Sequence, residues 1–294
     1  MKSLFEGVCV ALATPFLENG RVDFVSLEKL IDRCLKGGVQ AIAILATTGE
    51  SPTINEKERN LIIKFVRKRV PRDVKLIVGT GSNNMDKAIS NTTTAKKLGA
   101  DGVLVVTPYY NKTTQEGIVE YYRVLNCIGV PIIAYNVPSR TGLNIDLKTI
   151  KRLIKEDLIF GIKESTVDIN RIIELIHICE GKIAVYSGED NLNFLFYVLG
   201  GVGAVSVTAN IFPQEVVRLY DLVKTQKIKK AKKLAYRLDG INKLMFCETN
   251  PTPVKCALNI LGLTSSYVRP PLVKVAERNK IKIKKELQKL SKNK

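Results

Sequence analysis

The chain has 294 residues, and its 46 Lys and Arg residues against 28 Asp and Glu residues give a formal charge of +18. A composition that is 45% hydrophobic and 25% charged is typical of a globular protein and excludes a disordered or fibrous one. Residues 215–294 hold 20 of the basic and 6 of the acidic residues, so the charge excess is C-terminal and does not by itself indicate a nucleic-acid or membrane partner.

Eight short apolar runs rich in Val and Ile recur along the first part of the chain. They begin near Val8, Ala41, Lys75, Gly102, Pro131, Ile159, Ile183 and Gly203. Such runs without polar alternation are typical of strands buried on both faces, as in parallel sheets. Helical spacing fills the gaps, most clearly at 26–37, 56–70, 115–127 and 146–155. Eight strand–helix units in about 215 residues predict an α/β fold, a (β/α)8 TIM barrel.

The strand pattern ends near residue 212. Beyond it, helical spacing continues through the segments 214–226, 227–246, 252–261 and 270–290. We therefore expect two parts, a catalytic (β/α)8 barrel at residues 1–212 and a C-terminal α-helical domain at residues 213–294.

Several kinds of site are disfavoured by what the sequence lacks. The only histidine, His177, lies in an expected helix and is interpreted as structural, so neither a His-based triad nor a metal site is expected. The six cysteines are scattered without a C-x-x-C pair, which favours reduced thiols. No apolar run approaches about 20 residues, and no signal core precedes the first strand. We expect a cytoplasmic protein with no membrane partner.

In a barrel of this kind, the carboxyl ends of the strands carry the chemistry. Lys163 directly follows an apolar run, so its stem should start inside the barrel, whereas the adjacent Glu164 should face the opposite way. Burying a charged ammonium is costly, and a neutral amine can form a Schiff base with a carbonyl. A salt-bridged structural lysine is the alternative, and position alone does not separate the two.

A Schiff-base lysine needs a proton shuttle, and tyrosine is the obvious substitute where histidine is missing. Tyr135 ends the preceding strand and should neighbour Lys163, while Tyr110 and Thr47 would extend a chain of hydroxyls. Arg140 lies in the following turn and suits bidentate binding of a carboxylate, and the backbone amides around Thr47 suit a second one. A packed tyrosine ring and a solvated loop arginine are the structural alternatives.

Motifs at these strand ends extend over nearly the whole chain. They are T-T-G-E-S at 47–51, T-P-Y-Y-N at 107–111, Y-N-V-P-S-R-T-G at 135–142, G-I-K-E-S-T at 161–166, S-G-E-D at 187–190, S-V-T-A-N at 206–210 and N-P-x-P-V-K at 250–255. Together they resemble the 4-hydroxy-tetrahydrodipicolinate synthase family, within the class I pyruvate aldolase superfamily that contains N-acetylneuraminate lyase. The intact S-R-T-G and P-Y-Y-N are the most specific, because lyase relatives usually differ at the arginine.

The resemblance implies a lyase that condenses pyruvate with L-aspartate 4-semialdehyde to 4-hydroxy-tetrahydrodipicolinate in lysine and diaminopimelate biosynthesis. It implies a homotetramer that needs no cofactor beyond the Schiff base on Lys163. It assigns catalysis to Lys163, with a proton relay of Tyr135, Thr47 and Tyr110, of which Tyr110 reaches a neighbouring subunit's site. It assigns substrate binding to Thr47, Thr48, Arg140, Gly188 and Val205. The amides of Thr47 and Thr48 hold the pyruvate carboxylate, and Arg140 holds that of the second substrate.

Lysine-inhibited relatives bind their inhibitor in a cleft near the dimer interface. Ser51, Asn83 and Tyr109 match that site. Lys87 stands where strongly inhibited forms carry glutamate, and Glu56 and Arg59 stand where they often carry histidine. A positive Lys87 would repel the ammonium of bound lysine, so we expect weak or absent inhibition.

Two other functions are also compatible with the sequence. Another aldolase of the same superfamily, acting on a 2-keto sugar acid or another 2-keto acid, would share Lys163, but the intact Arg140 argues against it. A basic binding module would use the lysine-rich stretches 227–233 and 280–285. A solvated helix face explains such stretches more simply, so we expect no nucleic-acid partner.

Overall fold

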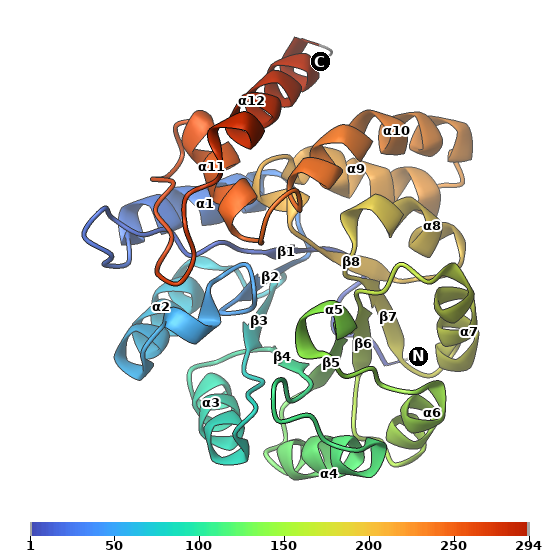
Figure 1. Cartoon of the computed structure of the whole chain (residues 1–294). Helices are drawn as coiled ribbons and strands as arrows, with labels where there is room; N and C mark the ends of the chain where they lie inside the picture. Colours follow the sequence, from blue (N-terminus) through green and yellow to red (C-terminus); the bar gives the residue numbers. More distant parts are fainter. Residues whose placement is uncertain (1, 293–294) are drawn as a thin grey trace.

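The computed structural model describes residues 2–292 and has at its centre a closed barrel of eight parallel strands in the order β1 to β8 (Figure 1). The strands are β1 Gly7–Ala11, β2 Ala41–Ile44, β3 Lys75–Gly79, β4 Gly102–Val106, β5 Ile132–Asn136, β6 Gly161–Glu164, β7 Ala184–Ser187 and β8 Gly203–Ser206. Nearly every strand residue is buried, because each strand lies between the barrel interior and the surrounding helices. The predicted (β/α)8 barrel is confirmed.

A ring of helices surrounds the strands (Figure 1). The α-helices are α1 Phe24–Lys36, α2 Glu56–Arg69, α3 Met85–Lys97, α4 Gln115–Asn126, α5 Pro138–Thr141, α6 Leu147–Lys155, α7 Ile169–Cys179, α8 Asn193–Val198, α9 Pro213–Lys224, α10 Ile228–Leu244, α11 Thr252–Ile260 and α12 Glu277–Lys292. Short 3-10 turns are η1 Ser51–Thr53, η2 Asp190–Leu192 and η3 Thr208–Asn210. Polar caps fix several starts: Asp23 accepts from the amide of Ser26, and Asn55 and Glu58 form a capping box at α2.

The chain after β8 forms helices, as expected, but not over all of the predicted ranges. Helix α9 packs on β1 and α1, whereas α10 and α11 both pack on α12. The predicted helix at 270–290 begins only at Glu277, because Pro270 and Pro271 lack the amide hydrogens that a helix interior requires. The boundary placed between residues 212 and 213 stays a prediction. Within residues 2–292, no helix has the length and apolar character needed to cross a membrane.

Candidate active site

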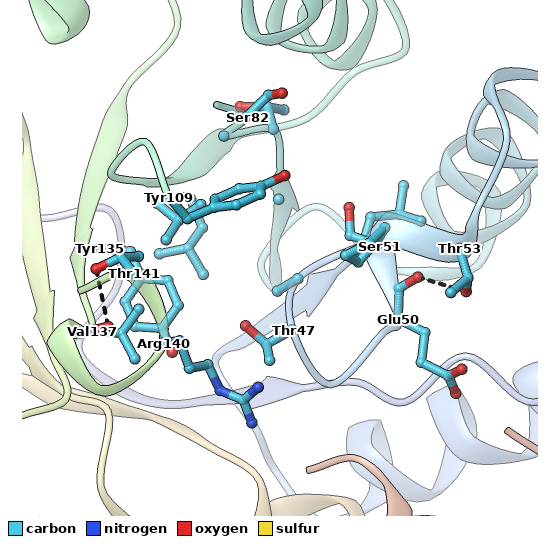
Figure 2. Close-up of a pocket in the computed structure, with 18 of the residues that line it drawn as sticks. Thr47, Glu50, Ser51, Thr53, Ser82, Tyr109, Tyr135, Val137, Arg140 and Thr141 are labelled. Carbon is cyan, nitrogen blue, oxygen red and sulfur yellow. Dashed lines mark hydrogen bonds between the residues drawn. The ribbon is translucent and has the colours of Figure 1, made fainter. Parts of the chain in front are cut away.

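A cavity of about 350 Å³ opens at the carboxyl ends of the strands (Figure 2). Its lining combines Thr47 from the turn after β2, Tyr135 from β5 and Arg140 from α5. Asn250, which lies just before α11, closes another side of the cavity. The barrel therefore brings together three of the residues predicted from separate strand ends, and the C-terminal extension contributes a fourth side chain.

Lys163 lies in β6, in register with Tyr135 of β5, and is 5% exposed. Its Nζ atom lies 4.2 Å from the centroid of the Tyr135 ring, which is itself buried. In the described part of the chain, no carboxylate oxygen lies within 4.0 Å of this nitrogen. The salt-bridged alternative therefore has no partner. A buried amine beside a tyrosine is the arrangement that attack on a carbonyl and the accompanying proton transfers require.

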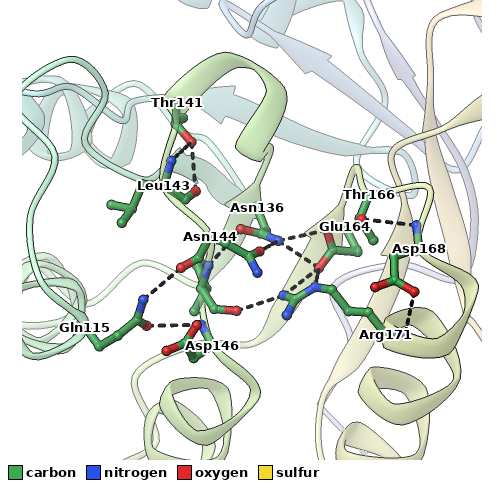
Figure 3. A network of polar contacts seen from close by, with 11 residues as sticks. Gln115, Asn136, Thr141, Leu143, Asn144, Asp146, Glu164, Thr166, Asp168 and Arg171 are labelled. Atoms are coloured by element: carbon green, nitrogen blue, oxygen red, sulfur yellow. Dashed lines mark hydrogen bonds and ion pairs between the residues drawn. The ribbon is translucent and has the colours of Figure 1, made fainter.

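Glu164 points to the opposite side of β6, as the alternation of strand side chains predicts. Its carboxylate accepts hydrogen bonds from Asn136 Nδ2 at 2.8 Å and Arg171 Nη2 at 2.9 Å (Figure 3). Burial raises the pKa of Glu164, although the charge of Arg171 and the hydrogen bond from Asn136 oppose this. This network joins the ends of β5 and β6 behind the cavity, so it fixes the backbone that carries Tyr135 and Lys163.

The turn after β2 presents two backbone amides, those of Thr47 and Thr48, to a possible anion. The amide of Gly49 donates to Ala46 O and that of Glu50 donates to Thr47 O, both at 3.1 Å. The amides of Thr47 and Thr48, by contrast, have no hydrogen-bond acceptor among residues 2–292. Neighbouring amides of this kind form a concavity that binds an anion, so the turn suits a small carboxylate.

Gly188 lies close to the buried lysine, whereas the position of Val205 is given by its strand pairing. A Cβ atom on Gly188 would come within 2.9 Å of Lys163 Cε and 2.0 Å of Ser165 Oγ, so a glycine keeps space beside the lysine. Val205 pairs in register with Cys9 across β1 and β8. Burial raises the pKa of the Cys9 thiol, and the nearby charge of Lys163 opposes this rise.

Tyr110 stands apart from the other predicted catalytic residues. It is 93% exposed and does not line the cavity, whereas the adjacent Tyr109 does. Its φ of 70° lies in the left-handed region, which is uncommon for an aromatic residue. Within one chain, Tyr110 is therefore not brought to Lys163, and its place in the relay stays a prediction that needs a second subunit.

Asn250 was missed as a functional residue by the sequence reasoning. Its Nδ2 donates to Thr48 Oγ1 at 3.0 Å, and its carbonyl accepts a hydrogen bond from Arg140 Nη2 at 3.3 Å. The N-P-x-P-V-K motif marked this position without giving it a role. Only the fold shows that residue 250 contacts the turn at residue 48, because the two are far apart in the chain.

The family model described as the dihydrodipicolinate synthetase family matches residues 4–290. The chain belongs to this family. It is 44% identical to the 4-hydroxy-tetrahydrodipicolinate synthase of Thermodesulfovibrio yellowstonii over 286 residues, which are 97% of this chain and 98% of that protein. Identity to the Methanococcus maripaludis enzyme of the same name is 44% over 287 residues, 97% of this chain and 98% of the relative.

Solved structures of the family share the fold. The dihydrodipicolinate synthase of Thermotoga maritima superimposes with a TM-score of 0.96 at 37% identity, covering 98% of this chain and 99% of that one. The family resemblance inferred from the strand-end motifs is therefore confirmed. The cavity is lined by residues of four of these motifs, those at 47–51, 107–111, 135–142 and 250–255.

Three residues of the predicted inhibitor site, Ser51, Lys87 and Tyr109, line the same cavity, whereas Asn83 is not among the lining residues. Arg59 also lines it and is 5% exposed. Its guanidinium donates to Ser51 Oγ and to a backbone carbonyl oxygen, both at 2.8 Å. Burial lowers the pKa of Arg59 to about 10, which still leaves it charged near neutral pH. The part of the cavity lined by Ser51, Arg59 and Lys87, here called its arm, therefore carries two positively charged side chains, Arg59 and Lys87.

Glu189 follows Gly188 just after β7 and should make the stability of the protein depend on pH. Burial and the neighbouring Asp190 raise the pKa of Glu189 from 4.5 to about 7, although Lys163 and Arg140 oppose this rise. The folded state thus holds the proton more tightly than the unfolded chain. The stabilising effect of the proton on Glu189 is complete below about pH 4.5 and is lost as the pH rises through 7.

A Glu189→Gln variant should therefore be more stable than the wild type at pH 8, by on the order of 1–3 kcal/mol, and equal to it near pH 4.5. Thermal unfolding followed by circular dichroism across this range measures the difference. Glu174→Gln, at an exposed position of α7, is the matched control and should show little change. A Glu189→Gln difference that stays constant with pH would contradict the assignment.

Proposed function

We propose that this protein is a cytoplasmic lyase that condenses pyruvate with L-aspartate 4-semialdehyde to 4-hydroxy-tetrahydrodipicolinate, in lysine and diaminopimelate biosynthesis. The observation that carries the proposal is the buried Lys163, which has no carboxylate partner among the described residues and lies against Tyr135. The chain belongs to a family whose similar members are named for this reaction. Arg140 and the free amides of Thr47 and Thr48 supply places for two substrate carboxylates.

In the proposed reaction, the Lys163 amine attacks C2 of pyruvate, and loss of one water from the carbinolamine gives the Schiff base. A proton leaves C3, and the resulting enamine forms the new carbon–carbon bond to the aldehyde carbon of the second substrate. The aldehyde oxygen takes up a proton and becomes the product's hydroxyl. The amine of the adduct then attacks C2 and displaces Lys163, which closes the ring and frees the lysine. No cofactor takes part in this scheme.

In this scheme Tyr135 moves the protons, and its register with Lys163 supports that role. In the proposed relay, Thr47 and Tyr110 continue the path, with Tyr110 supplied by a neighbouring subunit. Its 93% exposure and left-handed backbone suit a side chain whose contacts lie outside its own chain. Besides the surface at Tyr110, a second self-association surface for a homotetramer is offered by the exposed apolar side chains of Val167, just before α7, and Ile173, within α7.

The experiment that tests the function has two parts. Borohydride reduction in the presence of pyruvate should leave an adduct that peptide mass mapping places on Lys163. A coupled assay should then show turnover that depends on aspartate 4-semialdehyde. An unmodified Lys163 would overturn the mechanism, and trapping without semialdehyde-dependent turnover, together with cleavage of a 2-keto sugar acid, would overturn the substrate assignment.

Lysine should inhibit this enzyme weakly or not at all. Arg59 and Lys87 both line the cavity arm where an inhibitory lysine would place its ammonium, and like charges repel it. A titration of lysine into the coupled assay at fixed substrate concentrations measures the effect. Half-maximal inhibition well below about 1 mM would contradict this prediction, because it would require favourable binding of about 4 kcal/mol or more.

A further inference from the structure

The turn that carries Thr47 and Thr48 is held from outside by the C-terminal extension. At the end of this turn, the Glu50 carboxylate accepts a hydrogen bond from Lys255 Nζ in α11. It accepts another, at 3.0 Å, from the backbone amide of Arg269. Figure 2 shows the Glu50 side chain directed away from Thr47. Glu50 thus contributes to the site through the backbone that it anchors.

The turn needs such an anchor because its backbone is strained at both ends. Leu45 has a φ of 55° and Glu50 a φ of 53°, a region that costs a non-glycine residue about 1 kcal/mol or more. Such conformations persist only where surrounding contacts over-determine them. At the first end, packing is close: a Cβ atom on Gly79 would lie 2.2 Å from Leu45 O. At the second end, the contact is the ion pair between Glu50 and Lys255.

This ion pair is a fixed point inside the protein. The side chains of Lys255 and Glu50 are each 1% exposed. Lys255 Nζ also donates to Tyr267 O at 3.0 Å and lies 4.0 Å from the ring centroid of Phe16. Burial lowers the pKa of Lys255 to about 8, although Glu50 opposes this. Buried ion pairs add little net stability compared with apolar side chains of similar size, so stability is a poor explanation for this one.

We propose that Lys255 and Glu50 are positioning residues for pyruvate: together they set the turn whose Thr47 and Thr48 amides hold the pyruvate carboxylate. This inference rests on the proposed function. Neither side chain touches the reacting atoms. Their loss therefore weakens pyruvate binding and leaves the Schiff-base amine and the binding of the second substrate in place.

Two variants test the inference. Lys255→Met keeps much of the side-chain volume but removes the cation. Glu50→Asp keeps the charge but is one methylene too short to bond both Lys255 Nζ and the Arg269 amide. Each should raise the KM for pyruvate, and the pyruvate concentration that gives half-maximal borohydride trapping, by on the order of tenfold. The kcat and the KM for the semialdehyde should stay within about threefold of the wild type.

The matched control breaks another ion pair, far from the turn. Arg67 in α2 bonds Asp101 at 2.8 Å at the amino ends of the strands, and its side chain is 10% exposed. Arg67→Met should lower the Tm without changing the KM for pyruvate. If Lys255→Met and Glu50→Asp likewise change only the Tm, the positioning role is overturned. If Lys255→Met does not fold, Glu50→Asp decides alone.

Failure of the proposed function is visible separately. In that case the wild-type protein itself either traps no pyruvate at Lys163 or traps it without turnover that depends on aspartate 4-semialdehyde. A wild type that traps pyruvate, with variants that trap it at unchanged concentrations, overturns only the positioning role. Trapping needs no second substrate, so the comparison does not depend on the condensation step.

Discussion

A Lys163→Ala variant is expected to lose borohydride-trapped pyruvate entirely and to lose turnover by at least about 10³-fold. The reason is that Lys163 supplies the only protein atom that forms a covalent bond to a substrate in the proposed reaction. Mass spectrometry of the reduced protein and the coupled assay measure the two losses independently.

The stability of the same variant separates loss of chemistry from loss of fold. Lys163 is buried without a carboxylate partner in the described chain, so its removal leaves no unpaired anion behind. The Tm of Lys163→Ala should therefore be at or above that of the wild type, as is common when a functional residue is removed from a site. Lys151→Ala, at an exposed position of α6, is the control and should trap pyruvate normally. A pyruvate adduct that survives in Lys163→Ala would place the Schiff base elsewhere.

The fold was predictable from sequence because barrel strands are buried on both faces. Most of the eight strands are apolar runs, although β6 also holds Lys163 and Glu164, and the polar caps at Asp23 and Asn55 start the following helices. The segment from 270 to 276 was predicted wrongly as helix. There, helical spacing of apolar residues competes with Pro270 and Pro271, and the absence of their amide hydrogens decides the outcome.

The candidate site was predictable only where the strand order itself brings residues together. Tyr135 and Lys163 end neighbouring strands, so their register follows from the barrel. Lys255 and Asn250 lie about 200 residues from the turn that they hold, and no local pattern encodes a contact of that span. His177 was interpreted as structural because such histidines are often partly buried, but its side chain is 83% exposed.

The excess positive charge is also better understood from the fold. The lysine-rich stretches fall in α10 and α12, which lie outside the barrel and beyond α9 (Figure 1). The cavity has its own cations, among them Arg140 at the rim and Arg59 in the buried arm. Charge near the reacting centre thus comes from a few placed side chains. The charge of the outer helices contributes at most a long-range attraction for anions, which salt screens.

An Arg140→Ala variant should separate the two half-reactions. Pyruvate trapping should stay within about twofold of the wild type, because the Thr47 and Thr48 amides and Lys163 remain in place. The kcat/KM for aspartate 4-semialdehyde should fall by about 10²–10³-fold, which corresponds to the loss of roughly 3–4 kcal/mol from a bidentate charged contact. Trapping measured against pyruvate, and turnover measured against the semialdehyde, give the two numbers.

The geometry of Arg140 supports this split, because its guanidinium is only lightly engaged within the chain. Its described hydrogen bond is the long one, 3.3 Å, to the carbonyl of Asn250, so most of its donors are available to a substrate. Arg140→Lys should recover part of the lost kcat/KM, since it restores the charge but not the two-pronged contact. Arg72→Ala, at an exposed position before β3 and at the opposite end of the barrel, should leave both measurements unchanged. Equal losses of trapping and turnover in Arg140→Ala would show instead that this arginine holds pyruvate, and would move the second carboxylate site elsewhere in the cavity.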